Sequence, residues 1–389
     1  MIIVILISTT AFLVSYDLRS ERSETTPFYV GVSFCGNTTA EAKLLIDRVK
    51  TYTNLFVLQS GPVSKNETAT NEICNYAVAA GLRIIVYFGW FDPDYPWQTP
   101  WLNLAKQRWG DRFLGVYYYD EPGGIQLDYN WAHFFERIKQ LNSTLYQIHA
   151  AAIDRIINGS LPRSYDEAAK IYVNALETDS GLKALKTRLI TAFTSDYALY
   201  WFDYLGGYDV VLAQFGWNYS LVQNIALIRG AARMQNKSWG AIITWKYNQP
   251  PYLDSGEAIY QQMLMTYEAG AKYVIIFNYP KINDYGIMTD EHFEALERFW
   301  NHITTTPKSM RDSAEAALVL PRNYGWGMRH PEDRIWFWGP DEKSPQILEL
   351  SRKLLSQYGP YLDVAYDDPA FPITSKYAQI YYWNDSIYC

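Results

Sequence analysis

The segment FLGVYYYDEPGG, residues 113–124, contains the clearest structural signal in the chain. An apolar and aromatic run ends abruptly at Asp120 and Glu121, and Pro122 and two glycines follow. Acidic residues next to Pro-Gly are typical of the turn that ends a strand. The same arrangement also allows a rigid strand to hold a carboxylic acid at the edge of a pocket. Both interpretations predict a strand over residues 113–121.

Similar apolar runs recur on both sides of this segment and alternate with amphipathic stretches such as 39–52, 220–235, 255–271 and 289–303. The runs are continuous and rich in β-branched and aromatic residues, which is typical of parallel strands covered on both faces. With residues 113–121 there are eight, and the others lie at 28–34, 55–60, 82–90, 188–195, 208–217, 241–248 and 271–279. Eight strand–helix units over roughly 280 residues predict an α/β fold, a (β/α)8 TIM barrel. A doubly wound open sheet is the alternative, but we locate no switch point for it.

The chain divides into three regions. Residues 1–26 combine an apolar start with a polar linker, residues 27–305 form the barrel, and residues 306–389 form a small α/β unit. In the last region, apolar runs at 316–321 and 377–384 flank a helical pattern over 344–359, which predicts a βαβ segment packed on the barrel. Thr289 is the expected N-cap of the last barrel helix, where His292 should face solvent.

Composition limits the partners of the protein. The net charge of −7 provides no basic surface for nucleic acid. Aromatic residues make up 16% of the 389 residues, and tyrosine and tryptophan suit carbohydrate rings as well as cores. No histidine pair, glycine-rich phosphate loop or dinucleotide fingerprint is present, so we expect no metal and no cofactor. Cys35 and Cys74 would form a disulfide only in an oxidising compartment.

Two features predict a location outside the cytoplasm. The first residues form an apolar run of roughly 13, shorter than a membrane span of about 20, which fits a secretory signal; an uncleaved membrane anchor is the alternative. N-x-[S/T] sequons are also more frequent than chance predicts. They begin at Asn37, Asn66, Asn142, Asn158, Asn218, Asn236 and Asn384. We therefore expect an extracellular or cell-surface glycoprotein that contacts a membrane only through its N-terminal segment.

Polar and aromatic residues lie where the predicted strands end. In such barrels the carboxyl ends of the strands carry the chemistry, so these side chains should gather at one mouth. Carboxylates, amides and tryptophans in one cleft are typical of a sugar-binding site. The candidate catalytic residues are Glu121, Asp120, Asp196 and Asp92, with Asp94 beside the last. The candidate substrate-binding residues are Trp90, Gln214, Trp217, Trp245, Tyr247 and Asn278.

The barrel order and the YYYDEP sequence at 117–122 resemble the (β/α)8 glycoside hydrolase superfamily. In clan A of that superfamily the acid/base glutamate ends strand 4, usually within Asn-Glu-Pro. The resemblance implies that Glu121 is the general acid, with Asp120 in place of the asparagine. The C-terminal βαβ segment resembles the flavodoxin-like domain that follows the barrel in some β-galactosidase-type enzymes.

The sequence departs from clan A at strand 7, where the nucleophilic carboxylate of that clan lies. Lys246 and Asn248 occupy this position, while Asp254 and Glu257 come later and fit the start of the next helix. The second catalytic group therefore stays open among Asp92, Asp94 and Asp196, or Asp120 orienting an acyl group of the substrate. Asp92 and Asp94 also fit an ordinary turn.

Two function classes follow. The first is an exported glycoside hydrolase with Glu121 as general acid, whose pKa would be raised by burial and by Asp120. The second is a barrel that binds glycans or scaffolds a cell surface without catalysis, because fold alone does not guarantee activity.

Overall fold

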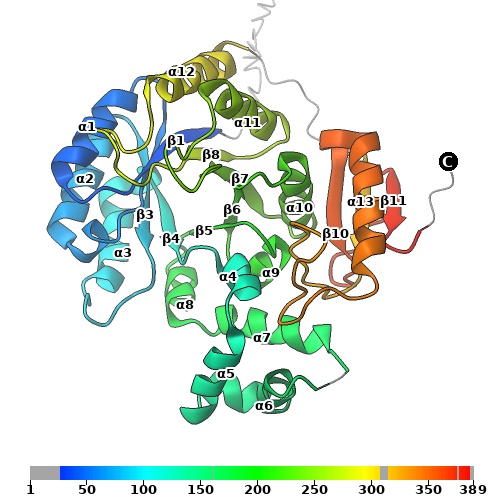
Figure 1. Cartoon of the computed structure of the whole chain (residues 1–389). Coiled ribbons are helices and arrows are strands. Elements are labelled where there is room, and N and C mark those ends of the chain that lie inside the picture. Colours follow the sequence, from blue (N-terminus) through cyan, green and yellow to red (C-terminus); the bar gives the residue numbers. More distant parts are fainter. Residues whose placement is uncertain (1–26, 161, 307–313, 375, 386–389) are drawn as a thin grey trace, which may run out of the picture.

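The computed structural model describes residues 27–160, 162–306, 314–374 and 376–385, and Figure 1 shows the arrangement of their helices and strands. Eight parallel strands hydrogen-bond in sequence order, and β1 pairs with β8 to close the barrel. The predicted TIM barrel is therefore confirmed. The strands are β1 (Tyr29–Phe34), β2 (Leu55–Leu58), β3 (Arg83–Phe88), β4 (Phe113–Tyr118), β5 (Ala192–Asp196), β6 (Val210–Phe215), β7 (Ser238–Ile243) and β8 (Tyr273–Ile276).

Alternate residues of each strand fill the barrel interior, and the residues between them pack against the outer helices. The interior group includes Tyr117, Phe193 and Tyr273, which are nearly fully buried. Gly115 allows β4 to approach β5, because a Cβ at this position would lie 2.2 Å from Thr191 O, and its φ is +150°. The close contact fixes the position of β4, whose end carries the acidic pair.

The outer layer consists of helices that follow the strands, as Figure 1 shows. Thr289 caps the last barrel helix as predicted, and His292 completes the cap by accepting a hydrogen bond from Thr289 N at Nδ1, 3.0 Å. The expectation that His292 faces solvent was wrong: its ring is buried, with Nε2 2.9 Å from Asp254 O. The helices of the outer layer that follow the strands are α1 (Thr39–Val49), α2 (Glu67–Ala79), α3 (Gln98–Trp109), α9 (Tyr200–Gly206), α10 (Leu221–Met234), α11 (Gly256–Glu268) and α12 (Asp290–Thr305).

The long connection between β4 and β5 is a helical insertion. Its first helix, α4, starts one residue after Glu121, and its second and third helices lie at the edge of the molecule in Figure 1. The insertion therefore begins at the acidic pair. The helices are α4 (Pro122–Asp128), α5 (Trp131–Gln140), α6 (Thr144–Ile157), α7 (Tyr165–Glu177) and α8 (Ser180–Thr187).

The C-terminal unit is a three-stranded parallel sheet with strand order β10-β9-β11. It contains β9 (Ala316–Leu320), α13 (Ser344–Tyr358), β10 (Leu362–Tyr366) and β11 (Gln379–Tyr382). The predicted βαβ segment is present, but β10 was not predicted, because Asp363 interrupts its apolar run. That carboxylate is buried and accepts a hydrogen bond from Arg229 Nε of α10 at 2.6 Å. The ion pair satisfies both charges and joins the unit to the barrel.

Strand β7, at Ser238–Ile243, starts three residues and ends five residues earlier than predicted, so Trp245 to Asn248 belong to the loop that follows it. The polar residues at its start concealed the strand from the hydrophobic pattern. Cys35 and Cys74 are both free thiols, and no disulfide joins them.

All seven sequon asparagines are exposed. Three of them, Asn142, Asn218 and Asn236, have positive φ, a conformation that asparagine tolerates better than most residues, so turn geometry also favours asparagine there. The predicted signal or anchor lies outside the described residues. Among the helices that the structure describes, none has the length and apolar character required to cross a membrane.

Candidate active site

Glu121 lies in a sharp turn between β4 and α4. It has φ 57° and ψ 43°, a left-handed conformation, and Tyr119 also has φ 57°. Such a conformation costs a residue with a Cβ roughly 1–2 kcal/mol and is retained only where the surroundings impose it. Here Glu121 N donates to Ser195 O of β5 at 2.9 Å, and Pro122 starts the helix. The turn thus directs the Glu121 side chain across the ends of the neighbouring strands.

A chain of hydrogen bonds joins Glu121 to the ends of β5 and β6. Gln214 Nε2 donates to Glu121 Oε1 at 2.8 Å and to Ser195 Oγ at 2.8 Å. Ser195 Oγ in turn donates to Asp120 Oδ1 at 2.9 Å, and the Tyr117 hydroxyl donates to the same carboxylate oxygen. The structure therefore brings together Glu121, Asp120 and Gln214, three of the residues expected at the mouth.

The two carboxyl groups have different electrostatic environments. Burial, followed by the charge of Asp120, raises the pKa of Glu121 to about 7, although the hydrogen bond from Gln214 lowers it. Burial also raises the pKa of Asp120, and the hydrogen bonds from Tyr117 and Ser195 offset only part of that rise. Asp120 accepts two hydrogen bonds from side chains, whereas Glu121 accepts one, from Gln214. This difference favours Asp120 as the ionised partner and leaves Glu121 able to hold a proton near neutral pH. This is the protonation state that a general acid requires.

The floor of the mouth contains two tyrosines that the sequence analysis did not select. Tyr87 of β3 meets Tyr117 edge-on, with ring centroids 5.4 Å apart. Burial and the charges of Asp120 and Cys35 raise the pKa of Tyr87 to about 12. Both residues occupy interior positions of the barrel, each one residue before the end of its strand, so counting alternate positions along β3 and β4 would have found them.

Cys35 also lies near this floor, after β1. Its Sγ is 3.5 Å from Ser33 Oγ, and burial raises the pKa of the thiol to about 12. The thiol is therefore protonated at neutral pH and is a poor nucleophile.

Aromatic side chains form one rim of the mouth. Trp245 is almost parallel to Tyr279, with an interplanar angle of 9° and ring centroids 6.2 Å apart. The ring centroid of Trp217 lies 5.9 Å from that of Trp245. Trp217 and Tyr279 are 40% and 48% exposed, so their faces are accessible. Trp90, after β3, is 57% exposed, and Tyr247 is also exposed. Four of the predicted binding residues thus present aromatic surface at the ends of β3, β6 and β7, and Tyr279, which was not predicted to bind, adds to it at the end of β8.

Asn278 has a different environment from the other predicted binding residues. Its side chain is buried, and its Oδ1 accepts hydrogen bonds from Ile287 N at 2.8 Å and Met288 N at 3.2 Å. Its Nδ2 donates to Tyr285 O. Both polar atoms therefore brace the loop between β8 and α12.

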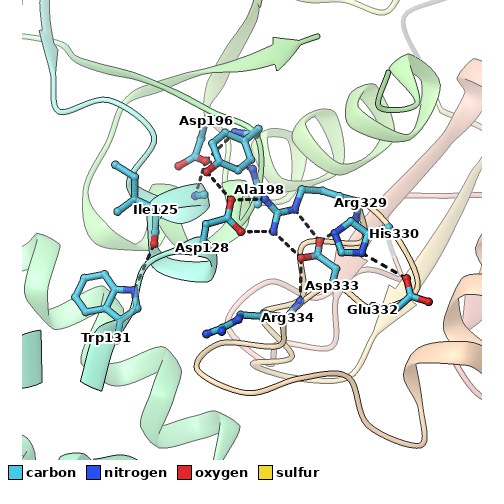
Figure 2. Close-up of polar contacts among 12 residues, drawn as sticks. Ile125, Asp128, Trp131, Asp196, Ala198, Arg329, His330, Glu332, Asp333 and Arg334 are labelled. Atoms are coloured by element: carbon cyan, nitrogen blue, oxygen red, sulfur yellow. Dashed lines mark hydrogen bonds and ion pairs between the residues drawn. The ribbon is translucent and has the colours of Figure 1, made fainter. Parts of the chain in front are cut away.

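Asp196 is fully buried beside α4, as Figure 2 shows. Its carboxylate accepts hydrogen bonds from Gly123 N, from Gly124 N at 2.8 Å and from Ala198 N at 3.1 Å. Tyr197 N donates to it as well. Burial raises the pKa of Asp196 to about 7, although the four backbone donors lower it. Asp196 thus binds the first turn of α4 from β5.

Asp92 lies in a turn after β3. Its Oδ1 accepts a hydrogen bond from Asp94 N at 2.9 Å, and its carbonyl accepts one from Tyr95 N at 2.9 Å. This is the geometry of the turn that the FDPDYP composition also fits. Asp120 is linked to Gln214 through Ser195, whereas the hydrogen bonds of Asp92 stay within its own turn and with Gln98.

The end of β7 carries an ion pair. Lys246 Nζ is 2.7 Å from Asp254 Oδ2, and Ser255 caps α11 directly after it. Glu257 lies in the first turn of α11 and pairs with Arg298 on α12 at 2.5 Å. The prediction that Asp254 and Glu257 belong to a helix start is confirmed. Within the described part of the chain, no three or more His, Cys, Asp or Glu side chains are grouped to hold a metal ion.

No protein-family profile matches the sequence, and none of the curated proteins compared with it is similar at the sequence level. Solved structures resemble its fold. A β-galactosidase from the Antarctic haloarchaeon Halorubrum lacusprofundi has a TM-score of 0.58 at 11% identity, over 91% of this chain and 68% of the other. An α-L-fucosidase from Paenibacillus thiaminolyticus gives 0.45 at 12% identity, over 75% and 52%. The PgaB glycoside hydrolase domain from Bordetella bronchiseptica gives 0.46 at 12% identity, over 70% and 99%.

Other barrel enzymes, among them 3-hexulose-6-phosphate synthase and orotidine 5′-monophosphate decarboxylase, also match, with TM-scores of 0.35 and 0.34. At these identities the likeness concerns the fold. The chain is a TIM barrel with distant structural similarity to glycoside hydrolases and to TIM-barrel enzymes of other classes.

Proposed function

We propose that the protein cleaves glycosidic bonds, with Glu121 as the general acid. The observation that carries the proposal is the position of Glu121: it lies in the turn after β4, is half-buried beside Asp120, and has a pKa near 7. An acid with this pKa can protonate a leaving-group oxygen near neutral pH. The accessible faces of Trp217, Tyr279 and Trp90 support a sugar substrate, because pyranose rings pack on such faces.

Asp120 is the second group that we propose for the reaction. Its carboxylate is next to Glu121 in the chain and is held by Tyr117 and Ser195, which favour its ionised form. In this position it can stabilise positive charge at the anomeric carbon or orient an acyl group of the substrate. The Lys246–Asp254 ion pair at the end of β7 favours such an arrangement over the clan A double displacement, which needs a free carboxylate there.

The test is replacement of Glu121 by Gln. A panel of natural glycans should be hydrolysed by the wild-type protein and by Glu136→Gln, an exposed glutamate on α5 that serves as the control. Glu121→Gln should reduce turnover by about 10²-fold or more, with an unchanged circular dichroism spectrum. Activated aryl glycosides are unsuitable substrates, because their leaving groups need little protonation. Wild-type turnover by the folded Glu121→Gln variant would exclude the proposal.

The same Lys246–Asp254 pair is the observation that favours the second candidate, a glycan-binding barrel without catalysis. Under that function, the panel would show binding to the aromatic rim and no sugar release from wild-type protein. Equilibrium binding and product analysis on the same panel separate the two functions.

We also propose that the barrel works outside the cytoplasm, as a secreted or N-terminally anchored glycoprotein. Support comes from the exposure of the seven sequon asparagines together with the apolar start of the chain. Expression in a glycosylating host, followed by mass spectrometry of the sequon peptides and fractionation of cells and medium, tests this proposal. Unmodified sequons in a protein confined to the cytosol would contradict it.

A further inference from the structure

The loop between β9 and α13, residues 321–343, reaches from the C-terminal unit to α4, as Figure 2 shows. Arg329 of this loop forms a two-pronged ion pair with the last residue of α4: its NH1 and NH2 groups lie 2.8 and 2.7 Å from the two carboxylate oxygens of Asp128. The same guanidinium donates from Nε and NH2 to Asp333 at 2.8 and 2.6 Å. The Arg329 side chain is only 6% exposed, so this charge is fixed between the two carboxylates.

Tyr197 connects this ion pair to the first turn of α4. The Arg329 guanidinium lies 5.2 Å from the centroid of the Tyr197 ring, and the Tyr197 hydroxyl donates to Asp128 Oδ2 at 2.9 Å. The ring lies so close to Gly124 that a Cβ there would be 2.0 Å from it. Tyr197 therefore packs against α4 while it contacts both members of the ion pair.

Helix α4 is thus fixed at both ends. Asp196 of β5 accepts hydrogen bonds from Gly123 N and Gly124 N at its start, and Arg329 pairs with Asp128 at its end. The residue before this helix is Glu121, in a left-handed conformation that persists only where its surroundings impose it. The contacts of α4 supply that constraint.

We propose that Arg329 of the C-terminal unit is a positioning residue for Glu121: it holds α4 through Asp128 and Tyr197 and balances the Asp128 charge. The inference rests on the proposed function, in which Glu121 is the general acid. It makes the C-terminal unit part of the support of the active site, although that unit contributes no residue to the hydrogen-bond chain at the mouth.

The charges around Glu121 predict the direction in which each variant should shift its pKa. Asp120, just after β4, and Asp128 of α4 both raise the pKa of Glu121, while Gln214 of β6 lowers it. Tyr197, after β5, lies close enough for the Glu121 charge to raise the pKa of its hydroxyl. Removing the Asp128 charge should therefore lower the pKa of Glu121, and removing the Arg329 charge should raise it. A purely structural role would not produce shifts of opposite sign.

The experiment follows the titration of Glu121 by NMR of isotope-labelled glutamate side chains, with Glu121→Gln to assign the signal. Asp128→Asn should lower the midpoint and Arg329→Met should raise it, each by about 0.3 pH unit or more. Arg329→Lys should keep the midpoint, because the charge remains, but should speed amide exchange in α4 by about tenfold, because lysine cannot form both prongs. The control is Arg298→Met, which breaks an exposed ion pair with Glu257 and should change neither quantity.

The Arg329→Met variant leaves Asp333 buried without its partner and can therefore fail to fold. Asp128→Asn avoids this outcome, because Arg329 still pairs with Asp333 in this variant. Asp128→Asn alone is therefore sufficient to test the inference. An unchanged midpoint together with unchanged α4 exchange in Asp128→Asn would overturn the inference. The titration needs no substrate, so it distinguishes this failure from failure of the proposed function, which only the activity of Glu121→Gln reports. If turnover is found, the alkaline limb of kcat/KM should move with the NMR midpoint.

Discussion

Gln214 donates from its Nε2 to Glu121 Oε1 at 2.8 Å, and the same amide group reaches Ser195 Oγ. One side chain of β6 therefore contacts the end of β4 and the end of β5. Its donor stabilises the ionised form of Glu121, in opposition to burial and Asp120, which raise the pKa of that carboxyl. The final pKa of about 7 is a balance in which Gln214 is the main lowering influence.

Replacing Gln214 by Met should raise the pKa of Glu121. Methionine keeps a similar volume but donates no hydrogen bond, so the carboxylate loses a stabilising partner and the acid form is favoured. We expect a rise on the order of 0.5–1 pH unit, measured by the labelled-glutamate titration. The matched control is Gln261→Met, which removes a 2.8 Å hydrogen bond from an exposed glutamine to Glu257 on the surface of α11. A lower midpoint in Gln214→Met would contradict this reading of the site.

Replacing Glu121 by Gln should stabilise the fold at alkaline pH. The pKa of Glu121 is raised in the folded state, so the folded protein binds the proton more tightly than the unfolded chain does, and wild-type stability falls as pH rises from the ordinary value of about 4.5 to about 7. Glutamine does not titrate. The difference in Tm between Glu121→Gln and wild type should therefore grow between about pH 5 and pH 8, as scanning calorimetry can show.

The exposed control Glu136→Gln should give a Tm difference that does not change with pH over the same interval. A Glu121→Gln variant that loses stability relative to wild type as pH rises would show that the carboxylate form of Glu121 is favoured by the fold.

The sequence predicted the barrel because its strands are continuous apolar runs with a clear period. It missed β10, where Asp363 interrupts the run, because the partner of that charge, Arg229, lies 134 residues away on α10. It also placed the start of β7 three residues late, since Ser238 and Gly240 at the start of the strand weaken the hydrophobic pattern. In both cases the missing information is the tertiary contacts of the strand. A polar residue in the sequence indicates a loop unless the buried partner that satisfies it is known.

The site could be predicted only as far as the sequence shows where each strand ends. Glu121, Asp120 and Gln214 were expected at the mouth and do meet there. The environments of Asp196 and Asn278 were not predictable, because both also follow strand ends, yet their polar atoms bind backbone groups. Strand position tells which end of the barrel a residue occupies, but the direction of its side chain depends on loops whose conformation the sequence pattern does not contain.

Replacing Asp363 by Asn should destabilise the whole molecule. Arg229 is buried and would lose the charge that it faces, which typically costs about 3–5 kcal/mol when a buried ion pair is broken. The C-terminal sheet packs on α10 of the barrel, so unfolding should remain a single transition at a lower denaturant midpoint. The control Glu72→Gln breaks an exposed ion pair with Lys43 and should change the free energy of unfolding by less than about 1 kcal/mol. A separate early transition in Asp363→Asn would show that the C-terminal unit unfolds independently.

Asp196 and Asp92, two of the three candidates for a second catalytic carboxylate besides Asp120, should respond differently to replacement by Asn. Asn at position 196 can accept through only one oxygen, so the Gly123 or Gly124 amides lose their acceptor, and the free energy of unfolding should fall by about 2–4 kcal/mol near pH 6. The loss should narrow as pH rises from about 4 to about 7 and stay constant above that, because over this interval wild type gives up the proton that the raised pKa of Asp196 retains. Asn at position 92 still accepts from Asp94 N, so stability and turnover should stay near wild type.

Urea unfolding at several pH values and turnover on the best glycan of the panel check both variants. Asp196→Asn should lose activity only as far as the fold around Glu121 is disturbed, since Asp196 is fully buried under α4 and its oxygens bind backbone amides. An Asp196→Asn variant with wild-type stability and no turnover would make Asp196 the second catalytic group. The same result for Asp92→Asn would assign that role to Asp92, and either outcome would remove Asp120 from the mechanism proposed above.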